Sequence, residues 1–275
     1  MSIERLRNIG RKNGVIQIVP PMTQVKPAFI RAAEDHELVS RPLSSPTGPG
    51  SASNFKNVAG SQISKPLVNN IYLGQFWGDR AFAEGFSKAI IENGYLDPLS
   101  ELGYGTGSGI YRGAIDGPAI PTAKNFLDDD AKKIVVQLLQ SGAIAPDPNL
   151  LCMLILPDGV TSQFGDDLSC KDYCGYHDFV EFSGMDIAYA VLPSTLCANC
   201  GGKIGDFTAV YAHELAEACT DKVPGSGWVA DDGQENGDLE AWILFGWGPS
   251  IDPNRYTVQG YYTNERGNTV GAWRN

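Results

Sequence analysis

Basic residues are scarce in this chain of 275 residues, which has 21 lysines and arginines against 32 aspartates and glutamates. The resulting formal charge of −11 repels the phosphates of nucleic acids and of anionic membrane surfaces. We therefore expect no nucleic-acid partner. The same excess of carboxylates suits a protein that holds hard cations such as calcium.

Long apolar runs are lacking near the N-terminus. The apolar run at residues 15–19 follows several basic residues, as in a signal peptide, but it is short and Pro20 and Pro21 end it. We therefore predict neither a signal peptide nor a transmembrane segment. The content of 43% hydrophobic and 10% aromatic residues instead predicts a globular body that buries most of its apolar surface.

Six cysteines are present, and four of them form two pairs that are close in sequence, namely Cys170 with Cys174 and Cys197 with Cys200. The second pair is a lone C-x-x-C between a proline and two glycines, a loop setting that favours neither a zinc site nor a thioredoxin-like site. We expect disulfides within the close pairs, with free thiols as the alternative. Cys152 and Cys219 lie in apolar segments and are expected to be small core residues.

The chain has only three histidines. His36 lies among charged residues and is expected at the surface. His213 lies in a segment whose apolar residues recur at helical period, which predicts an amphipathic helix over residues 206–221, ending before Pro224.

His213 and Glu217 are four residues apart in this helix, so their side chains lie on one face and can reach a single metal ion. Glu214 projects beside that point and can take a proton from a metal-bound water, as the same residue does in an H-E-x-x-H zinc protease. Because Glu217 stands where that motif has histidine, zinc would be a weaker Lewis acid here, and calcium or manganese is an alternative. An ordinary helix with solvated glutamates and a core histidine also fits this short motif.

An acidic segment follows the helix. Five acidic residues and no basic residue lie between Trp228 and Glu240. Glu235 can return across the helix as a third oxygen ligand. Asp238 is then either a fourth ligand or a hydrogen-bond partner of His213.

His177 is the only other histidine in the part expected to fold. It can ligate the metal or bind a developing oxyanion, with Asp178 orienting its ring. The alternative is a structural histidine held in a loop.

Several motifs together carry a resemblance to a known family. The run His213-Glu-Leu-Ala-Glu-Ala-Cys-Thr-Asp221, then Gly227-Trp228 and Glu235-Asn-Gly-Asp238, resembles secreted bacterial and fungal proteins related to the plant Exordium (phosphate-induced protein) family. Shorter matches follow the family's order: Ile71-Tyr-Leu-Gly-Gln-Phe-Trp77, Cys174-Gly-Tyr-His177, Tyr256-Thr-Val-Gln259 and Tyr262-Thr-Asn264. The resemblance spans residues 68–270. It departs from the family pattern at Leu239, where a cysteine is expected.

The resemblance implies a zincin-like domain and a zinc metallopeptidase, because bacterial members are often treated as such. Plant members are better known as wall-associated growth proteins, so a non-catalytic protein with a structural ion is the alternative. The implied partner is a peptide or protein substrate, or a cell-wall polymer. The implied location is extracellular, and the lack of a visible signal peptide leaves a cytoplasmic location as the alternative.

Residues 1–66 show little periodicity and include a stretch rich in serine, proline and glycine, so we expect an extended arm or linker there. A pro-segment that covers the active cleft and a disordered tail are the two interpretations. Residues 67–275 are expected to form one domain of the α/β or α+β class, with a mixed sheet packed on the helix of the H-E-x-x-E motif. The apolar strands are expected at residues 68–76, 150–156 and 187–192.

Overall fold

The computed structural model describes residues 11–12, 15–16, 18–19, 55–121, 125–241, 244–248, 256–264 and 269–270. Most of the arm expected at residues 1–66 therefore lies outside the described residues. Within it, Phe55 and Ile63 are buried against the rest of the chain.

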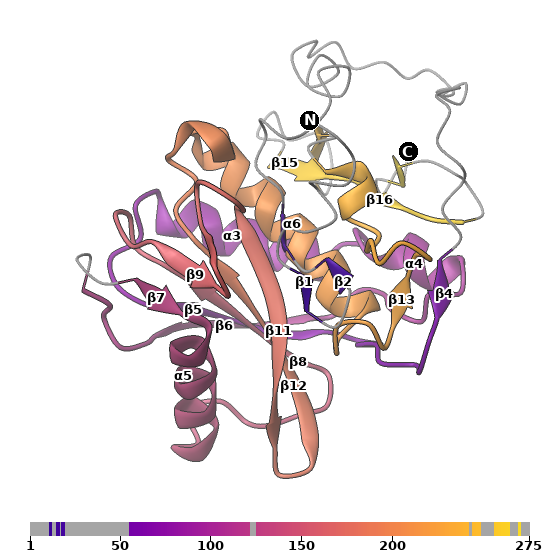
Figure 1. Ribbon diagram of the computed structural model, residues 1–275, viewed down its shortest axis with the longest axis horizontal. Helices are drawn as coiled ribbons and strands as arrows, with labels where there is room; N and C mark the ends of the chain where they lie inside the picture. Colours follow the sequence, from indigo (N-terminus) through magenta and orange to yellow (C-terminus); the bar gives the residue numbers. More distant parts are fainter. Residues whose placement is uncertain are drawn as a thin grey trace.

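A six-stranded mixed sheet forms the centre of the molecule (Figure 1). Its strands, in spatial order, are β3 (Ile18–Val19), β11 (Gly175–Phe182), β12 (Met185–Leu192), β8 (Leu150–Ile155), β5 (Leu67–Tyr72) and β6 (Ile110–Asp116). The last four strands run parallel to one another, whereas β11 is antiparallel to both of its neighbours. The predicted mixed α/β architecture is confirmed, and each of the three apolar runs forms a strand whose ends lie within four residues of the expected bounds.

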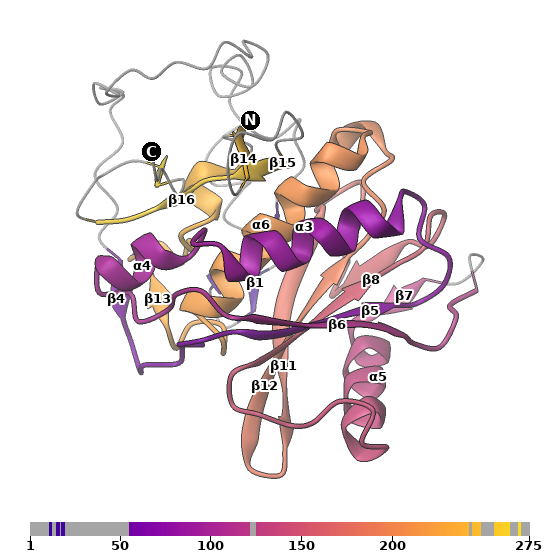
Figure 2. The ribbon, with the colours of Figure 1, turned by 180° about the vertical axis from the view of Figure 1, so that it is seen from behind.

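Helices cover both faces of this sheet. They are α3 (Arg80–Glu92), α4 (Asp97–Glu101), α5 (Asp128–Gln140) and α6 (Ile204–Thr220). Side chains of β8 alternate between the two cores, because successive residues of a strand point to opposite faces: Met153 packs in the core with α3 and α6, and Cys152 packs in the core with α5. Figure 2 shows α3 beside α6 on one side of the sheet and α5 on the other.

Short strands form the remaining sheets. They are β1 (Arg11–Lys12) with β2 (Val15–Ile16), β4 (Lys56–Asn57) with β13 (Trp228–Val229), β7 (Phe126–Leu127) with β9 (Ser162–Phe164) and β10 (Asp167–Leu168), β14 (Leu244–Trp247) with β15 (Tyr256–Gln259), and β16 (Tyr261–Tyr262) with β17 (Thr269–Val270). Two short 3-10 helices, η2 (Ala198–Cys200) and η3 (Asp238–Glu240), flank α6 in the sequence.

The motif helix α6 is buried on all sides, and the expectation of an amphipathic helix is wrong. Every residue from Asp206 to Thr220 is buried. The reason is that α6 packs against β11 and β12 of the central sheet and also along β15, so no face is left for solvent. Its polar side chains therefore face protein atoms, which is costly for carboxylates unless they are neutralised or paired.

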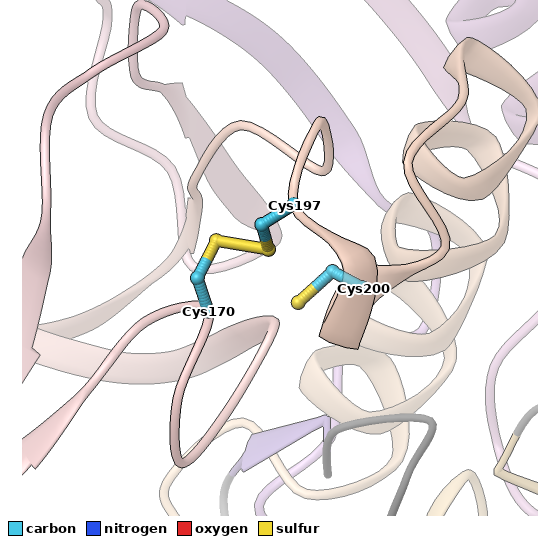
Figure 3. A group of neighbouring side chains, drawn as sticks. All are labelled: Cys170, Cys197 and Cys200. Atoms are coloured by element: carbon cyan, nitrogen blue, oxygen red, sulfur yellow. A yellow bond between two sulfur atoms is a disulfide. The ribbon is translucent and has the colours of Figure 1, made fainter.

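Two disulfides join the segment before β11 to the segment before α6, and the expected pairing within each close pair is wrong. Cys170 bonds to Cys197 with Cα atoms 6.0 Å apart, and Cys174 bonds to Cys200 with Cα atoms 5.6 Å apart. Figure 3 shows the first bond, with the sulfur of Cys200 beside it. Because β12 returns antiparallel to β11, its end lies next to the start of β11, and this pairing brings the two cysteine segments together.

Cys152 and Cys219 are buried free thiols, as expected for small core residues. None of the helices among the described residues is long and apolar enough to cross a membrane. The N-terminal strand β3 pairs with β11 at Gly175 and Tyr176, so described residues of the arm lie at the edge of the central sheet. Whether the arm serves as a pro-segment stays a prediction.

Candidate metal centre

Three structural elements bring the six predicted site residues together. Helix α6 carries three of them, β11 carries one, and the loop from β13 into η3 carries two: His213, Glu214, Glu217, His177, Glu235 and Asp238. Five of these side chains are at most 1% exposed, and Asp238 is partly buried. The cluster is thus an internal polar site rather than a surface acidic patch.

His213 is held from both sides of its ring. Nε2 lies 2.9 Å from Oε1 of Glu217, one helical turn further along α6. Nδ1 lies 2.7 Å from the amide nitrogen of Gln259, which also donates to the carbonyl oxygen of Gly237 at 3.0 Å. Because an amide nitrogen can only donate, Nδ1 is the acceptor here and Nε2 carries the ring proton, although its contact with Glu217 is not a well-formed hydrogen bond. Ligation of a metal through Nε2 requires the other tautomer.

His177 lies on β11 and faces three carboxylates. Nδ1 is 3.3 Å from Oε2 of Glu214 and 3.8 Å from Oε2 of Glu217, and Nε2 is 3.4 Å from Oε1 of Glu235. Nε2 also lies 3.3 Å from the carbonyl oxygen of Asp221, at the end of α6. This histidine therefore bridges the helix and the acidic loop.

Asp178 does not orient the ring of His177, contrary to expectation. The two residues are neighbours on a strand, so their side chains point to opposite faces of the sheet. The carboxylate of Asp178 lies 3.0 Å from Nζ of Lys132 on α5, and both Asp178 and His177 are fully buried.

Two glycines allow backbone to approach the carboxylates closely. A Cβ atom on Gly237 would lie 2.7 Å from Oε1 of Glu217, and one on Gly175 would lie 2.8 Å from Oε1 of Glu214. Both distances are too short for non-bonded atoms, so a side chain at either position would displace a candidate ligand or the candidate base.

The potential ligand atoms fall into two groups that share Glu217. One group contains His213, Glu217 and Asp238, and the other contains His177, Glu217 and Glu235. In each group the ligand atoms all lie within 4.8 Å of one another. The two acidic residues expected as the third and fourth ligands of one ion are thus divided between the groups.

Burial shapes the electrostatics of the site. It raises the pKa of Glu214 to about 7 and that of Glu217 to about 8, and it raises the pKa values of Glu235 and Asp238 well above their usual range. Burial lowers the pKa of His213. It also acts to lower the pKa of His177, but the negative charges of Glu235 and Glu214 outweigh it, and the pKa is raised.

The residues present fit a divalent cation on physical grounds. Within the described part of the chain, no carboxylate oxygen of Glu214, Glu217 or Glu235 has a well-formed hydrogen bond, although all are fully buried. Buried carboxylates are otherwise satisfied or neutralised. Imidazole and carboxylate groups are ligands that suit zinc and manganese, and carboxylates also suit calcium.

Two residues in the site were missed by the sequence reasoning. Gln259, which contacts His213, lies 46 residues further along the chain, so no local pattern could reveal the contact. The carboxylate of Asp221 accepts hydrogen bonds from the backbone N–H groups of Gly225, Ser226 and Gly227 at 2.7, 3.0 and 2.5 Å. Its place directly after a helix, with two glycines in the next six residues, was the available sign of such a loop.

The fold and the site together define a mixed α/β protein with a buried cluster of histidines and carboxylates that could hold metal ions. Comparison of the chain with protein-family models, with curated proteins and with solved structures finds no match. The resemblance drawn from the sequence motifs stays a prediction.

Proposed function

We propose that this protein is a metal-dependent hydrolase, with a peptide bond as its substrate and zinc as its metal. The observation that carries the proposal is the set of donor atoms on His213, Glu217 and Asp238, which lie within 4.8 Å of one another, with the buried residue Glu214 directly after His213 on α6. In this assignment Asp238 is the third ligand. A bound zinc ion would polarise the substrate carbonyl and lower the pKa of a coordinated water.

Glu214 would be the general base. It follows the first ligand on α6, and its pKa of about 7 suits a group that accepts and returns a proton near neutral pH. Its Oε2 atom lies 3.3 Å from Nδ1 of His177, so the carboxylate forms an ion pair with the imidazole when that ring is protonated. In the presence of substrate, the same ring could donate a proton to a developing oxyanion.

One feature of the fold supports the zincin-like interpretation, and another supports the expected location. A mixed sheet packs on the helix that carries the motif, as the resemblance implies. The two disulfides support an oxidising compartment, since such bonds are rare in reducing ones, and thus support an extracellular location.

The test is Glu214→Gln in the zinc-loaded protein, assayed with fluorescently labelled casein. We expect the variant to keep its bound zinc and its Tm, and to lose at least about a hundredfold in hydrolysis. Glu181→Gln, an exposed residue on β11, is the matched control and should behave as wild type. Equal hydrolysis by wild type and Glu214→Gln would refute the role of Glu214.

A second candidate function is that of a non-catalytic, wall-associated protein with a structural ion. The complete burial of Glu214, Glu217 and His177 favours it, because a structural ion is enclosed whereas a catalytic one keeps an open position. It predicts that wild-type protein hydrolyses no substrate although removal of its metal lowers the Tm. Hydrolysis that depends on Glu214 would exclude this candidate.

A further inference from the structure

Glu217 presents its two oxygen atoms to different histidines. Oε1 lies 2.9 Å from Nε2 of His213, and Oε2 lies 3.8 Å from Nδ1 of His177. A carboxylate with this orientation can contribute one oxygen to each of two ions. Its position between the two ligand groups is fixed by α6, which is buried along this whole stretch.

Each group can close around one ion by a limited movement of its side chains. In a tetrahedral site with bonds of about 2.1 Å, ligand atoms lie about 3.4 Å apart. The atoms within each group are at most 4.8 Å apart, so each group would have to contract by about 1.4 Å at most to coordinate its own ion. The donors of His177 and Glu235 belong to the second group and not to the group of His213 and Asp238.

The charge in the site also exceeds what one divalent ion neutralises. Four carboxylates face the cluster, and among the described residues none of them forms an ion pair with lysine or arginine: Glu214, Glu217, Glu235 and Asp238. When all four are ionised and both histidines are neutral, as metal ligands must be, one divalent cation leaves a net charge of −2 and two cations leave none. Burial of uncompensated charge is strongly unfavourable.

We propose that the protein binds two divalent cations, bridged by Glu217, with the second held by His177, Glu217 and Glu235. The unsatisfied and fully buried oxygens of Glu235 and Glu217 point to this second position independently of any catalytic role. The inference rests on the proposed function only for the first position, and it makes His177 a metal ligand in place of a proton donor to the oxyanion. Two ions that share a carboxylate would lie about 4 Å apart, a separation typical of two-metal sites.

The experiment measures the number of ions per folded chain. The full-length protein is stripped with chelator, dialysed, and titrated with Zn²⁺ or Mn²⁺, and the bound metal is quantified by elemental analysis. We expect saturation at two ions per chain and, with Mn²⁺, an electron paramagnetic resonance spectrum that shows coupling between the two ions.

Variants assign the positions. Glu235→Gln should bind one ion, His213→Ala should bind one ion, and Glu217→Gln should weaken binding at both positions. Asp231→Asn, which removes an exposed carboxylate from the same loop, is the matched control and should bind two. Circular dichroism identifies any variant that does not fold. If a variant does not fold, the number of ions bound by wild type and the coupling between its two Mn²⁺ ions test the proposal.

Saturation of the wild type at one ion, or two ions in Glu235→Gln, would overturn the second position. Two ions in a protein without hydrolytic activity would uphold it and refute the proposed function. One ion per chain together with hydrolysis that depends on Glu214 would refute the second position and uphold the proposed function.

Discussion

Gln259 influences the candidate site through the orientation of His213 rather than through a charge. Its amide is fully buried and contacts both the imidazole and the carbonyl oxygen of Gly237, so it ties α6 to β15 and to the acidic loop. Partners of this kind set the tautomer and the ring orientation of a metal-binding histidine. For His213 to ligate through Nε2, Nδ1 has to carry the ring proton and donate a hydrogen bond to the amide oxygen of Gln259.

We therefore predict that Gln259→Leu weakens zinc binding about 10- to 100-fold, measured by competition with a chromogenic chelator. In Gln259→Glu the ionised carboxylate is an acceptor only, so it can accept the hydrogen bond from Nδ1. This variant should therefore retain tight zinc binding. Gln137→Leu, on α5 across the sheet, is the control and should bind zinc as wild type does. Unchanged affinity in Gln259→Leu would show that the ring needs no such support.

At the scale of elements, the two disulfides connect the start of β11 to the turn that begins α6. Strand β11 carries His177, and α6 carries three candidate site residues. The cross-links therefore help to fix the position of His177 relative to the residues of α6. Each bond closes a loop with a sequence separation of 26 or 27 residues, and such loops lose substantial entropy when the unfolded chain is cross-linked.

Peptide mapping without reductant should therefore recover Cys170 linked to Cys197 and Cys174 linked to Cys200, with Cys152 and Cys219 unmodified until the protein is denatured. The double variant Cys170→Ser/Cys197→Ser should lose about 2–4 kcal/mol of unfolding free energy, measured with urea. A double variant of the two buried free thiols, Cys152→Ala/Cys219→Ala, is the control for loss of sulfur and should leave the map unchanged. Recovery of a Cys197–Cys200 bond would contradict the cross-linked arrangement.

At the scale of the whole molecule, a cluster of carboxylates and histidines lies inside a chain that already carries a net charge of −11. Without a cation, burial raises the pKa values of Glu214 and Glu217 to about 7 and 8 from a usual value of 4.5. The folded chain then holds these protons more tightly than the unfolded chain does, so stability falls as the pH rises between 4.5 and about 8. His177, whose pKa is also raised, acts in the same direction, and His213, whose pKa is lowered, acts against it.

We predict that the Tm of the chelator-treated protein decreases from pH 5 to pH 8, and that added zinc raises the Tm most at pH 8. A ligand that binds only the folded chain adds about 4 kcal/mol at a thousandfold excess over its Kd. Differential scanning calorimetry at several pH values, with chelator and with zinc, measures both effects. Identical Tm values with and without metal at every pH would contradict a cation in the cluster. A His213→Ala variant, which keeps one of the two metal positions, should show a smaller rise in Tm with zinc than wild type does.

Some of this structure follows from sequence alone. The i, i+4 spacing placed His213 and Glu217 on one face of a helix, because helical geometry depends only on hydrogen bonds between residues four apart. For the same reason the helix begins and ends within two residues of its expected bounds, and the apolar runs that form the parallel strands were recognisable from composition.

Tertiary structure alone decided how distant residues meet. The disulfide pairing depends on the antiparallel return of β12, and the burial of α6 depends on β15, which follows it by more than thirty residues. The division of the ligands between His213 and His177 depends on how β11 and the acidic loop pack on α6. Such contacts are set by sheet register, loop closure and packing of distant segments, which no periodicity within a short stretch of sequence records.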